Sequence, residues 1–224
     1  MNTQPTPPEA SAPRIPLTKE RVHRAAVALA DEQGIEALSM RRLAKELGVE
    51  AMSLYNHVAN KDEILSGILE LVATEVELPA PEDDWKTAVR RSAISSRDTY
   101  LRHPWASSLS LSRQSGGPSQ LRRADGILRA LREAGFSSDV IYHAFHILDA
   151  YILGFTVQHL SFPYQGEELA GMANTFIQQL PADAYPDLVG HIREHLEPEH
   201  GDKGGFELGL DLILDGLERA RDSA

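Results

Sequence analysis

Nine side chains between residues 40 and 61 have the chemistry needed to read a polar, negatively charged groove. They combine hydrogen-bonding groups, apolar tips and cations, and they are Met40, Arg41, Ala51, Met52, Ser53, Tyr55, Asn56, His57 and Lys61. Amide, hydroxyl and guanidinium groups bind base edges in the major groove of DNA, and cations hold phosphates. These residue types therefore favour a DNA-binding surface.

Two short helices must hold these side chains at one surface. Leu43 and Ala44 give the first helix an apolar face, and Leu54 and Val58 give one to the second. Gly48 lies between them and can take the positive φ that ends a helix within one residue. Because the small Ala44 also lets the partner helix approach closely, this segment predicts a helix-turn-helix.

Capping residues delimit the helices around this motif. Thr18 is expected to cap a first helix that ends at Gly34, and Ser39 to cap the next one. Asn60 and Glu63 have the spacing of a capping box that opens a longer helix. The helix-turn-helix domain is therefore expected to span residues 17–62.

The remaining chain is expected to form a separate, wholly helical domain. The proline content of residues 1–16 predicts a disordered arm. This stretch is not expected to be a secretory signal, because it lacks a basic leader and an apolar core. Residues 63–80 are expected to form a connecting helix. The acidic, proline-containing run Leu78–Asp84 is expected to mark the domain boundary, and the body is expected to span residues 81–224.

No segment alternates like a strand, so the predicted fold class is all-α. The body helices are expected at about Trp85–Arg102, Trp105–Leu111, Pro118–Ala134, Ser138–Leu160, Glu167–Leu180, Pro186–Leu196 and Phe206–Ala220.

Charge is distributed unevenly along the chain. The 224 residues carry 22 basic and 33 acidic side chains, a net charge of −11. Between Arg14 and Lys61, however, eight basic residues face six acidic ones, which leaves +2 there and −13 elsewhere. The chain should therefore bind DNA only through this basic end, with a steep salt dependence. The absence of cysteine indicates a reducing, cytoplasmic setting.

Two body helices are apolar on more faces than one small domain readily covers. The helix from Ser138 is apolar nearly all round, but polar residues interrupt it too often for a membrane span. The last helix carries a stripe of Phe206, Leu210, Ile213 and Leu217 beside Gly209 and Gly216, which favours close helix packing. We expect a four-helix homodimer interface, the alternative being the ordinary core of a monomer. A homodimer would place two recognition helices about 34–36 Å apart on an inverted-repeat operator.

The chain resembles the TetR family of repressors. The segment LGVEAMSLYNHVANKDEIL is similar to that family's helix-turn-helix signature, and GFSSDVIYHAFHILDAYILGF and FELGLDLILDGLERA are similar to tetracycline-repressor-like regulatory domains. The resemblance implies a DNA-binding repressor released by a small-molecule effector. It implies base-edge contacts from Arg41, Met52, Ser53 and Asn56, flanked by Met40 and Ala51, and phosphate contacts from Tyr55, His57 and Lys61. The alternative for Tyr55 and His57 is packing across the helical seam.

A polar line on the helix from Ser138 could serve an effector. Tyr142, His146 and Asp149 stand at i, i+4 and i+7 with Phe145 beside them, so they form either a self-satisfied core network or part of a ligand site. The resemblance places pocket walls at these four positions and at Ser92, Ser96, Ser110 and Gln158. Tetracycline repressors bind a magnesium chelate through a histidine and a glutamate, where this chain has Ser110 and Gln158. We therefore expect no metal cofactor and an uncharged or weakly polar, aromatic or polyketide-like effector.

Two rival functions remain open. His191, Glu194 and His195 spell H-x-x-E-H, an inverted zinc-protease motif in which two histidines would bind zinc and Glu194 would act as base. A downstream third ligand is poorly provided, so the alternative of a solvated helix is preferred and no catalytic residue is expected. A DNA-binding activator without small-molecule control is the other alternative.

Overall fold

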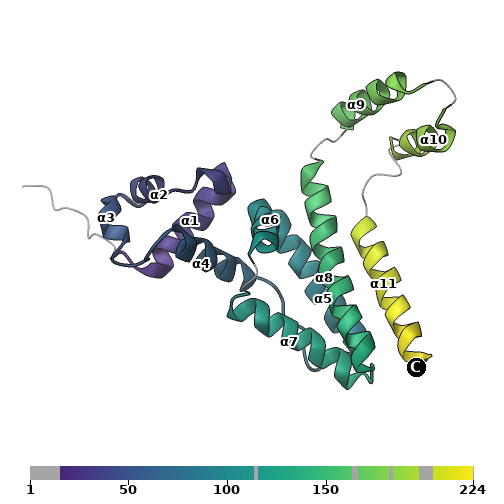
Figure 1. Ribbon diagram of the computed structural model, residues 1–224, viewed down its shortest axis with the longest axis horizontal. Coiled ribbons are helices and arrows are strands. Elements are labelled where there is room, and N and C mark those ends of the chain that lie inside the picture. Colours follow the sequence, from purple (N-terminus) through teal and green to yellow (C-terminus); the bar gives the residue numbers. More distant parts are fainter. Residues whose placement is uncertain (1–15, 114–115, 163–165, 182–183, 197–203, 224) are drawn as a thin grey trace, which may run out of the picture. The chain divides into compact units, whose positions relative to one another are not determined.

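The chain is helical and divides into two compact units. A computed structural model describes residues 16–113, 116–162, 166–181, 184–196 and 204–223. Within these ranges it contains eleven α-helices, one 3-10 turn and no strand, which confirms the all-α prediction (Figure 1). The division between the units falls between Leu71 and Val72, near the end of α4.

The first unit consists of short helices whose ends follow from their capping residues. Its elements are α1 (Lys19–Gln33), the 3-10 turn η1 (Ile35–Ala37), α2 (Met40–Leu47), α3 (Ala51–Leu54) and most of α4 (Lys61–Ala73). The Thr18 hydroxyl accepts a hydrogen bond from the Arg21 N–H at 3.1 Å, and the Ser39 hydroxyl accepts one from the Arg42 N–H at 3.3 Å. Both predicted caps are therefore confirmed, and Gly34 ends α1 with φ +80°.

The start of α4 differs slightly from the expected capping box. The Glu63 N–H donates to Asn60 Oδ1 at 2.9 Å, as predicted. The Glu63 carboxylate, however, accepts from the N–H of Ala59 at 2.6 Å rather than from that of Asn60. It also forms an ion pair with Lys19, so one side chain ties the start of α4 to α1. The helix ends at Ala73.

The second unit has its core between four helices. Its elements are α5 (Trp85–Arg102), α6 (Pro104–Ser112), α7 (Pro118–Glu133), α8 (Ser138–Ser161), α9 (Gly166–Gln179), α10 (Pro186–His195) and α11 (Gly205–Asp222). Side chains from α5, α7, α8 and α11 form one apolar cluster that includes Leu131, Leu148, Leu210 and Leu214. Figure 1 shows α5, α8 and α11 side by side. These three helices and α7 therefore form the frame of the body.

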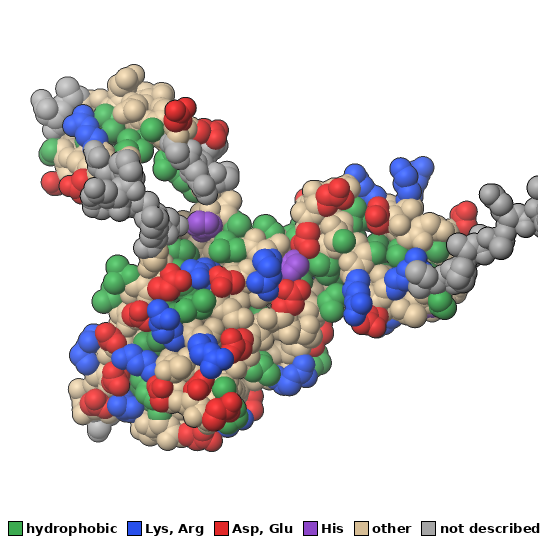
Figure 2. All heavy atoms as spheres, turned by 180° about the vertical axis from the view of Figure 1, so that it is seen from behind, with side chains coloured by type: hydrophobic (Ala, Val, Ile, Leu, Met, Phe, Trp, Pro, Cys, Tyr) green, Lys and Arg blue, Asp and Glu red, His purple; other side chains and the backbone are tan. Residues whose placement is uncertain are grey.

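Ion pairs join the surfaces of α5 and α11. Arg90 binds Asp211 through two nitrogen–oxygen contacts of 2.7 and 3.2 Å, and Lys86 lies 2.6 Å from Asp215. Acidic and basic side chains are interleaved across the face of this unit shown in Figure 2. Because these pairs are partly exposed to water, they orient α11 more than they stabilise it.

The apolar stripe expected at a dimer interface lies inside the chain instead. Phe206, Leu210 and Leu217 are buried in the core, and Ile213 packs against it. A Cβ at Gly209 would overlap the Tyr151 side chain, so this glycine permits a close approach of α8 and not of a partner helix. The assignment of this stripe to an interface was therefore wrong, because α11 has apolar residues on two faces and the longer stripe packs inward.

A second apolar face of these helices is open to solvent. Leu208 and Leu212 of α11 are 65% and 61% exposed, and Tyr142 and Ile147 of α8 are also exposed. By length and composition α8 could cross a membrane, and only 28% of its most apolar 18-residue window is buried within the chain. The chain by itself therefore leaves much of α8 uncovered.

Candidate nucleic-acid interface and body cavity

The turn between α2 and α3 has the geometry that the sequence predicted. Gly48 adopts φ +66° and ψ +35°, the left-handed conformation. The N–H of Val49 donates to the Ala44 carbonyl at 3.0 Å, and the N–H of Gly48 donates to that of Lys45 at 3.2 Å, so the last carbonyls of α2 are satisfied. Leu43, Ala44 and Leu54 are buried in the seam between the two helices. The helix-turn-helix is therefore built around a single left-handed residue.

The nine side chains predicted to contact DNA all have some exposed surface. Arg41, Met52, Tyr55, Asn56 and Lys61 are exposed, and Met40, Ala51, Ser53 and His57 are partly exposed. Met52 is 74% exposed, although it is large and apolar. Such exposure is expected of a residue that contacts a partner, and Tyr55 is too exposed to be a seam residue. Six of the nine lie on the short α3 or directly after it, whereas Met40 and Arg41 begin α2 and Lys61 begins α4.

Four cations around the helix-turn-helix are unpaired. Arg41, Arg42, Lys45 and Lys61 form no ion pair with any residue that the structure describes. By contrast, Lys19 binds Glu63, and Arg24 binds Glu20 at 2.6 Å. Unpaired cations retain their full attraction for phosphates, because no carboxylate has to be displaced. Arg42 and Lys45 were not predicted from the sequence to contact DNA. The only indication of such a role was their position in the basic segment.

The Lys61→Ala variant is expected to bind all DNA sequences more weakly and to flatten the salt dependence. If Lys61 neutralises one phosphate, the slope of log affinity against log salt should fall by about one unit. The measurement is a titration of one DNA duplex at several salt concentrations. Arg132→Ala in α7 is the matched control, because Arg132 is exposed and lies in the other unit. An unchanged slope for Lys61→Ala would exclude this contact.

A histidine in the first unit packs tightly between α1 and α4. The His23 ring lies where a side chain at position 67 would begin, so any larger residue there would force the ring to shift. Its Nε2 is buried and has no hydrogen-bond partner within the described part of the chain. Burial lowers the pKa of His23 below its usual 6.5 and the charge of Lys19 lowers it further, while Glu63 acts in the opposite direction.

Acidification between neutral pH and pH 5 is therefore expected to destabilise the first unit through His23. The unfolded chain binds a proton at this residue below about pH 6.5, whereas the folded chain resists protonation. The stability contributed by neutral His23 is thus present above that pH and is lost as the pH falls through the lowered pKa. Urea denaturation of wild type and His23→Gln at both pH values would measure it. Equal losses in both proteins would contradict this assignment.

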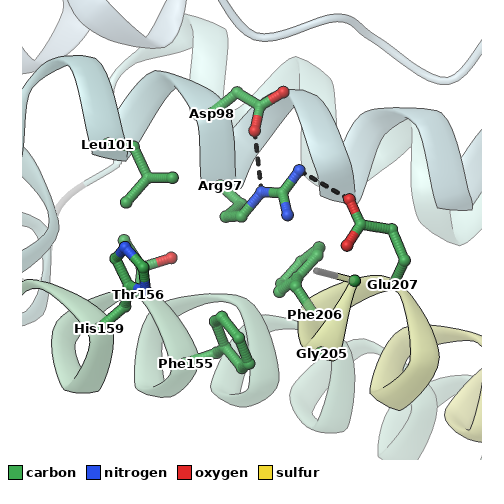
Figure 3. A pocket seen from close by; sticks show the side chains of 10 residues that line it. Arg97, Asp98, Leu101, Phe155, Thr156, His159, Gly205, Phe206 and Glu207 are labelled. Atoms are coloured by element: carbon green, nitrogen blue, oxygen red, sulfur yellow. Dashed lines mark hydrogen bonds and ion pairs between the residues drawn. The ribbon is translucent and has the colours of Figure 1, made fainter. Parts of the chain in front are cut away.

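The body contains a cavity of about 360 Å³ between α5, α8 and the start of α11. Figure 3 shows the side chains that line it. They are Arg97, Asp98, Leu101, Phe155, Thr156, His159, Phe206 and Glu207, together with Gly204 and Gly205. None of the eight predicted effector residues lines this cavity. Phe155, Thr156 and His159 lie close to the predicted Gln158 in sequence, but their orientation had no signal in the residue pattern.

Arg97 organises the polar part of this cavity. Its guanidinium is 2.8 Å from Asp98 and 2.9 Å from Glu207, and it lies 4.6 Å above the Phe206 ring (Figure 3). Burial disfavours the charged form of Glu207, but the hydrogen bond and charge of Arg97 outweigh this effect and lower its pKa below the usual value. The cavity therefore contains one cation and two carboxylates beside aromatic rings.

Two of the predicted effector serines, Ser92 and Ser96, are buried one turn apart on α5, and the third, Ser110 on α6, is partly buried with a buried Oγ. The Ser96 hydroxyl donates to the Ser92 carbonyl at 2.8 Å. Among the described residues, neither Ser92 Oγ nor Ser110 Oγ has a hydrogen-bond partner. A buried hydroxyl without a partner is costly, so these two groups are suited to receive a polar ligand atom.

The predicted polar line on α8 is not a buried network within one chain. Tyr142 and His146 are exposed, with ring centroids 4.7 Å apart, because no helix among the described residues covers this side of α8. Asp149 is paired instead with Arg123 of α7 at 2.8 Å. Phe145 packs against the core, and Gln158 is exposed.

The H-x-x-E-H motif lies on α10. His191 and Glu194 are exposed, and the side chain of His195 lies outside the described residues. The described residues contain no group of three His, Cys, Asp or Glu side chains that could hold a metal ion.

Comparison with known proteins gives matches over both units. The family described as "Bacterial regulatory proteins, tetR family" matches residues 23–68, and "Tetracyclin repressor-like, C-terminal domain" matches residues 78–221. The chain is 35% identical to the HTH-type transcriptional repressor DrrR1 of Streptomyces coeruleorubidus over 92% of this chain and 79% of that protein. It is 30% identical to the class A tetracycline repressor from transposon 1721 of Escherichia coli over 92% of each chain. The structure of the TetR family protein ActR of Streptomyces coelicolor in complex with actinorhodin matches with a TM-score of 0.75 and 31% identity, over 92% of this chain and 99% of that one.

Proposed function

Because this chain belongs to the TetR family of bacterial transcriptional regulators, we propose that it is a homodimeric repressor that a small molecule releases from an inverted-repeat operator. The observation that carries the proposal is the exposed helix-turn-helix with four unpaired cations. DrrR1 is a repressor and ActR binds actinorhodin, which supports both repression and control by a small molecule.

The helix-turn-helix of the first unit, here called the head, reads the DNA sequence through α3 and the start of α2. Arg41, Met52, Ser53 and Asn56 contact base edges in this proposal, with Met40 and Ala51 beside them. Tyr55, His57 and Lys61 hold phosphates and so fix the register of the head on DNA. The exposure of these residues supports the proposal, because none of them is needed to fill the core.

Homodimerisation follows from the open apolar faces of α8 and α11. Leu208, Leu212, Tyr142 and Ile147 are exposed in the single chain, although each has a large apolar surface. A second copy would cover the same faces by two-fold symmetry and place two heads on one side of the DNA. Covering α8 by protein also removes any need for a membrane, so we propose a cytoplasmic protein.

Small-molecule control acts through the body. Ser92, Ser96, Ser110, Tyr142, Phe145, His146, Asp149 and Gln158 remain the proposed effector contacts. The buried hydroxyls of Ser92 on α5 and Ser110 on α6 have no hydrogen-bond partner among the described residues, which supports a ligand with polar atoms. The helix α4 belongs to both units, so it is the element through which effector binding would change the separation of the two heads. We propose no metal, no cofactor and no catalytic activity.

Selection of bound DNA from a random duplex pool tests this function. Recovery of an inverted repeat would support the head, the dimer and sequence specificity together. Compounds that raise the melting temperature can then be tested for release of that DNA. A monomer that binds no duplex even at low salt would contradict the proposal, and a DNA-binding dimer that no compound releases would favour an activator or repressor without small-molecule control.

The Arg41→Ala variant is expected to weaken operator binding by about 1–3 kcal/mol and to relax specificity at one base pair, if the guanidinium binds a guanine edge. The measurement compares the affinities of wild type and variant for the selected operator and for single-base variants of it. Equal affinity and unchanged specificity in the variant would remove Arg41 from the base-reading set.

A further inference from the structure

The cavity of 360 Å³ between α5, α8 and α11 lies on a different side of α5 from the proposed effector residues Ser92 and Ser96. Successive helical residues are rotated by about 100°, so Arg97 and Leu101 lie about 140° around α5 from Ser92 and Ser96, respectively. The cavity is therefore a separate space and not an extension of the serine side. Its volume is within the range of small-molecule sites, about 300–1,000 Å³.

The apolar walls of this cavity are aromatic and flat. The rings of Phe155 and His159 are nearly parallel, with an interplanar angle of 12° and centroids 6.5 Å apart. Phe206 meets Phe155 edge to face at a centroid distance of 5.2 Å. Tyr151 stacks on Phe206 and donates a hydrogen bond to its carbonyl at 2.9 Å, which holds Phe206 in place. Fixed aromatic walls of this kind favour a flat aromatic ligand, because little side-chain order is lost on binding.

The polar groups of the cavity restrict the charge of its ligand. The Asp98 and Glu207 carboxylates would repel an anion. The Arg97 cation, which covers the Phe206 ring, would repel a ligand cation from the same ring. A guanidinium has five N–H donors, however, and only two of its nitrogens contact the carboxylates. The remaining donors can bind a neutral carbonyl or hydroxyl oxygen.

We propose that this cavity is a second small-molecule site, which binds an uncharged, flat aromatic compound with carbonyl or hydroxyl oxygens. Phe155, Phe206 and His159 contact the rings of the compound. Arg97 donates to one of its oxygens while remaining paired with Glu207. Nothing in this site depends on whether the head binds DNA, so the two proposals succeed or fail separately.

The test uses the full chain and quinizarin, a neutral dihydroxyanthraquinone, with binding measured by isothermal titration calorimetry at neutral pH. Anthraquinone sulfonate is the matched anionic probe, and we expect it to bind at least about tenfold more weakly. Arg97→Gln should weaken quinizarin binding about tenfold through the loss of a charged donor. Leu101→Trp should abolish measurable binding by filling the cavity.

Phe145→Ala is the control for the other side of the body, and thermal unfolding of each variant checks its fold. Retained quinizarin affinity in both Arg97→Gln and folded Leu101→Trp would overturn the proposal. So would a loss of binding confined to Phe145→Ala, or no binding to the unaltered chain. If Leu101→Trp does not fold, the Arg97→Gln variant and the comparison of the two probes still test the proposal. Gel-shift assays on the same preparations test DNA binding independently.

Discussion

Leu212→Glu is expected to convert the dimer into a monomer and to weaken operator binding by about a hundredfold or more. Leu212 is 61% exposed in the single chain, so the fold of the monomer does not require its leucine side chain. In a two-fold dimer the substitution places two carboxylates in an apolar interface, and burying unpaired charges costs far more than the leucine contact contributed. Each head would then bind its half-site alone, without the effective concentration that the second head provides.

The matched control for this experiment is Leu121→Glu. Leu121 is 62% exposed and lies on α7, away from the open face of α11, so the same chemical change there should leave both the dimer and the operator affinity intact. Sedimentation measures the oligomeric state, and gel shifts measure operator binding. A Leu212→Glu protein that remains dimeric would place the interface elsewhere, whereas a monomeric variant with full affinity would contradict bivalent binding.

Gly67→Ala is expected to destabilise the first unit by about 1–3 kcal/mol, the usual cost of overpacking a core. In an open helix the same change stabilises by about 0.5–1 kcal/mol, so the expected sign is reversed here. The new Cβ would overlap three atoms of the His23 ring, so the ring would have to leave its place between α1 and α4. DNA binding should weaken in parallel, because α1 and α4 support the helix-turn-helix.

A second substitution tests the cause of that loss. His23→Ala removes the ring that the new Cβ would overlap. Gly67→Ala should therefore cost much less stability in the His23→Ala background than in the wild type. Gly171→Ala in α9 is the control, because a Cβ there meets no atom within 4 Å. Both tryptophans, Trp85 and Trp105, lie in the second unit, so a loss of circular dichroism without a change in tryptophan fluorescence reports the first unit. Additive losses in the double variant would contradict the steric explanation.

The elements of the fold were largely predictable because their signals are local. Thr18, Ser39 and Asn60 each cap a helix through a bond to a backbone N–H three residues away, and Gly48 ends α2 by its own φ. Such bonds depend only on neighbours in the sequence. The nine DNA-contacting residues were named from their residue types and from the family resemblance, and their contacts with DNA stay a prediction.

The body site was not predictable in this way. The α11 helix carries two apolar stripes, and the pattern alone could not decide that Phe206 and Leu210 face the core while Leu208 and Leu212 face outward. Likewise, Asp149 was grouped with Tyr142 and His146 by helical spacing, but its partner is Arg123 of another helix. These choices depend on which helices meet, and those contacts join residues far apart in the sequence.

The sequence by itself determined the helices, most of their ends and the helix-turn-helix, because capping, turn conformation and helical period are set by residues within about four positions of each other. The family was indicated by the resemblance of its motifs. Only the tertiary structure decided which face of α11 is buried, which cations of the head are unpaired, and that Arg97, Phe155 and Glu207 surround one cavity. The reason is that side chains from α5, α8 and α11 compete for the same core space. The outcome of that competition is a property of all three helices together.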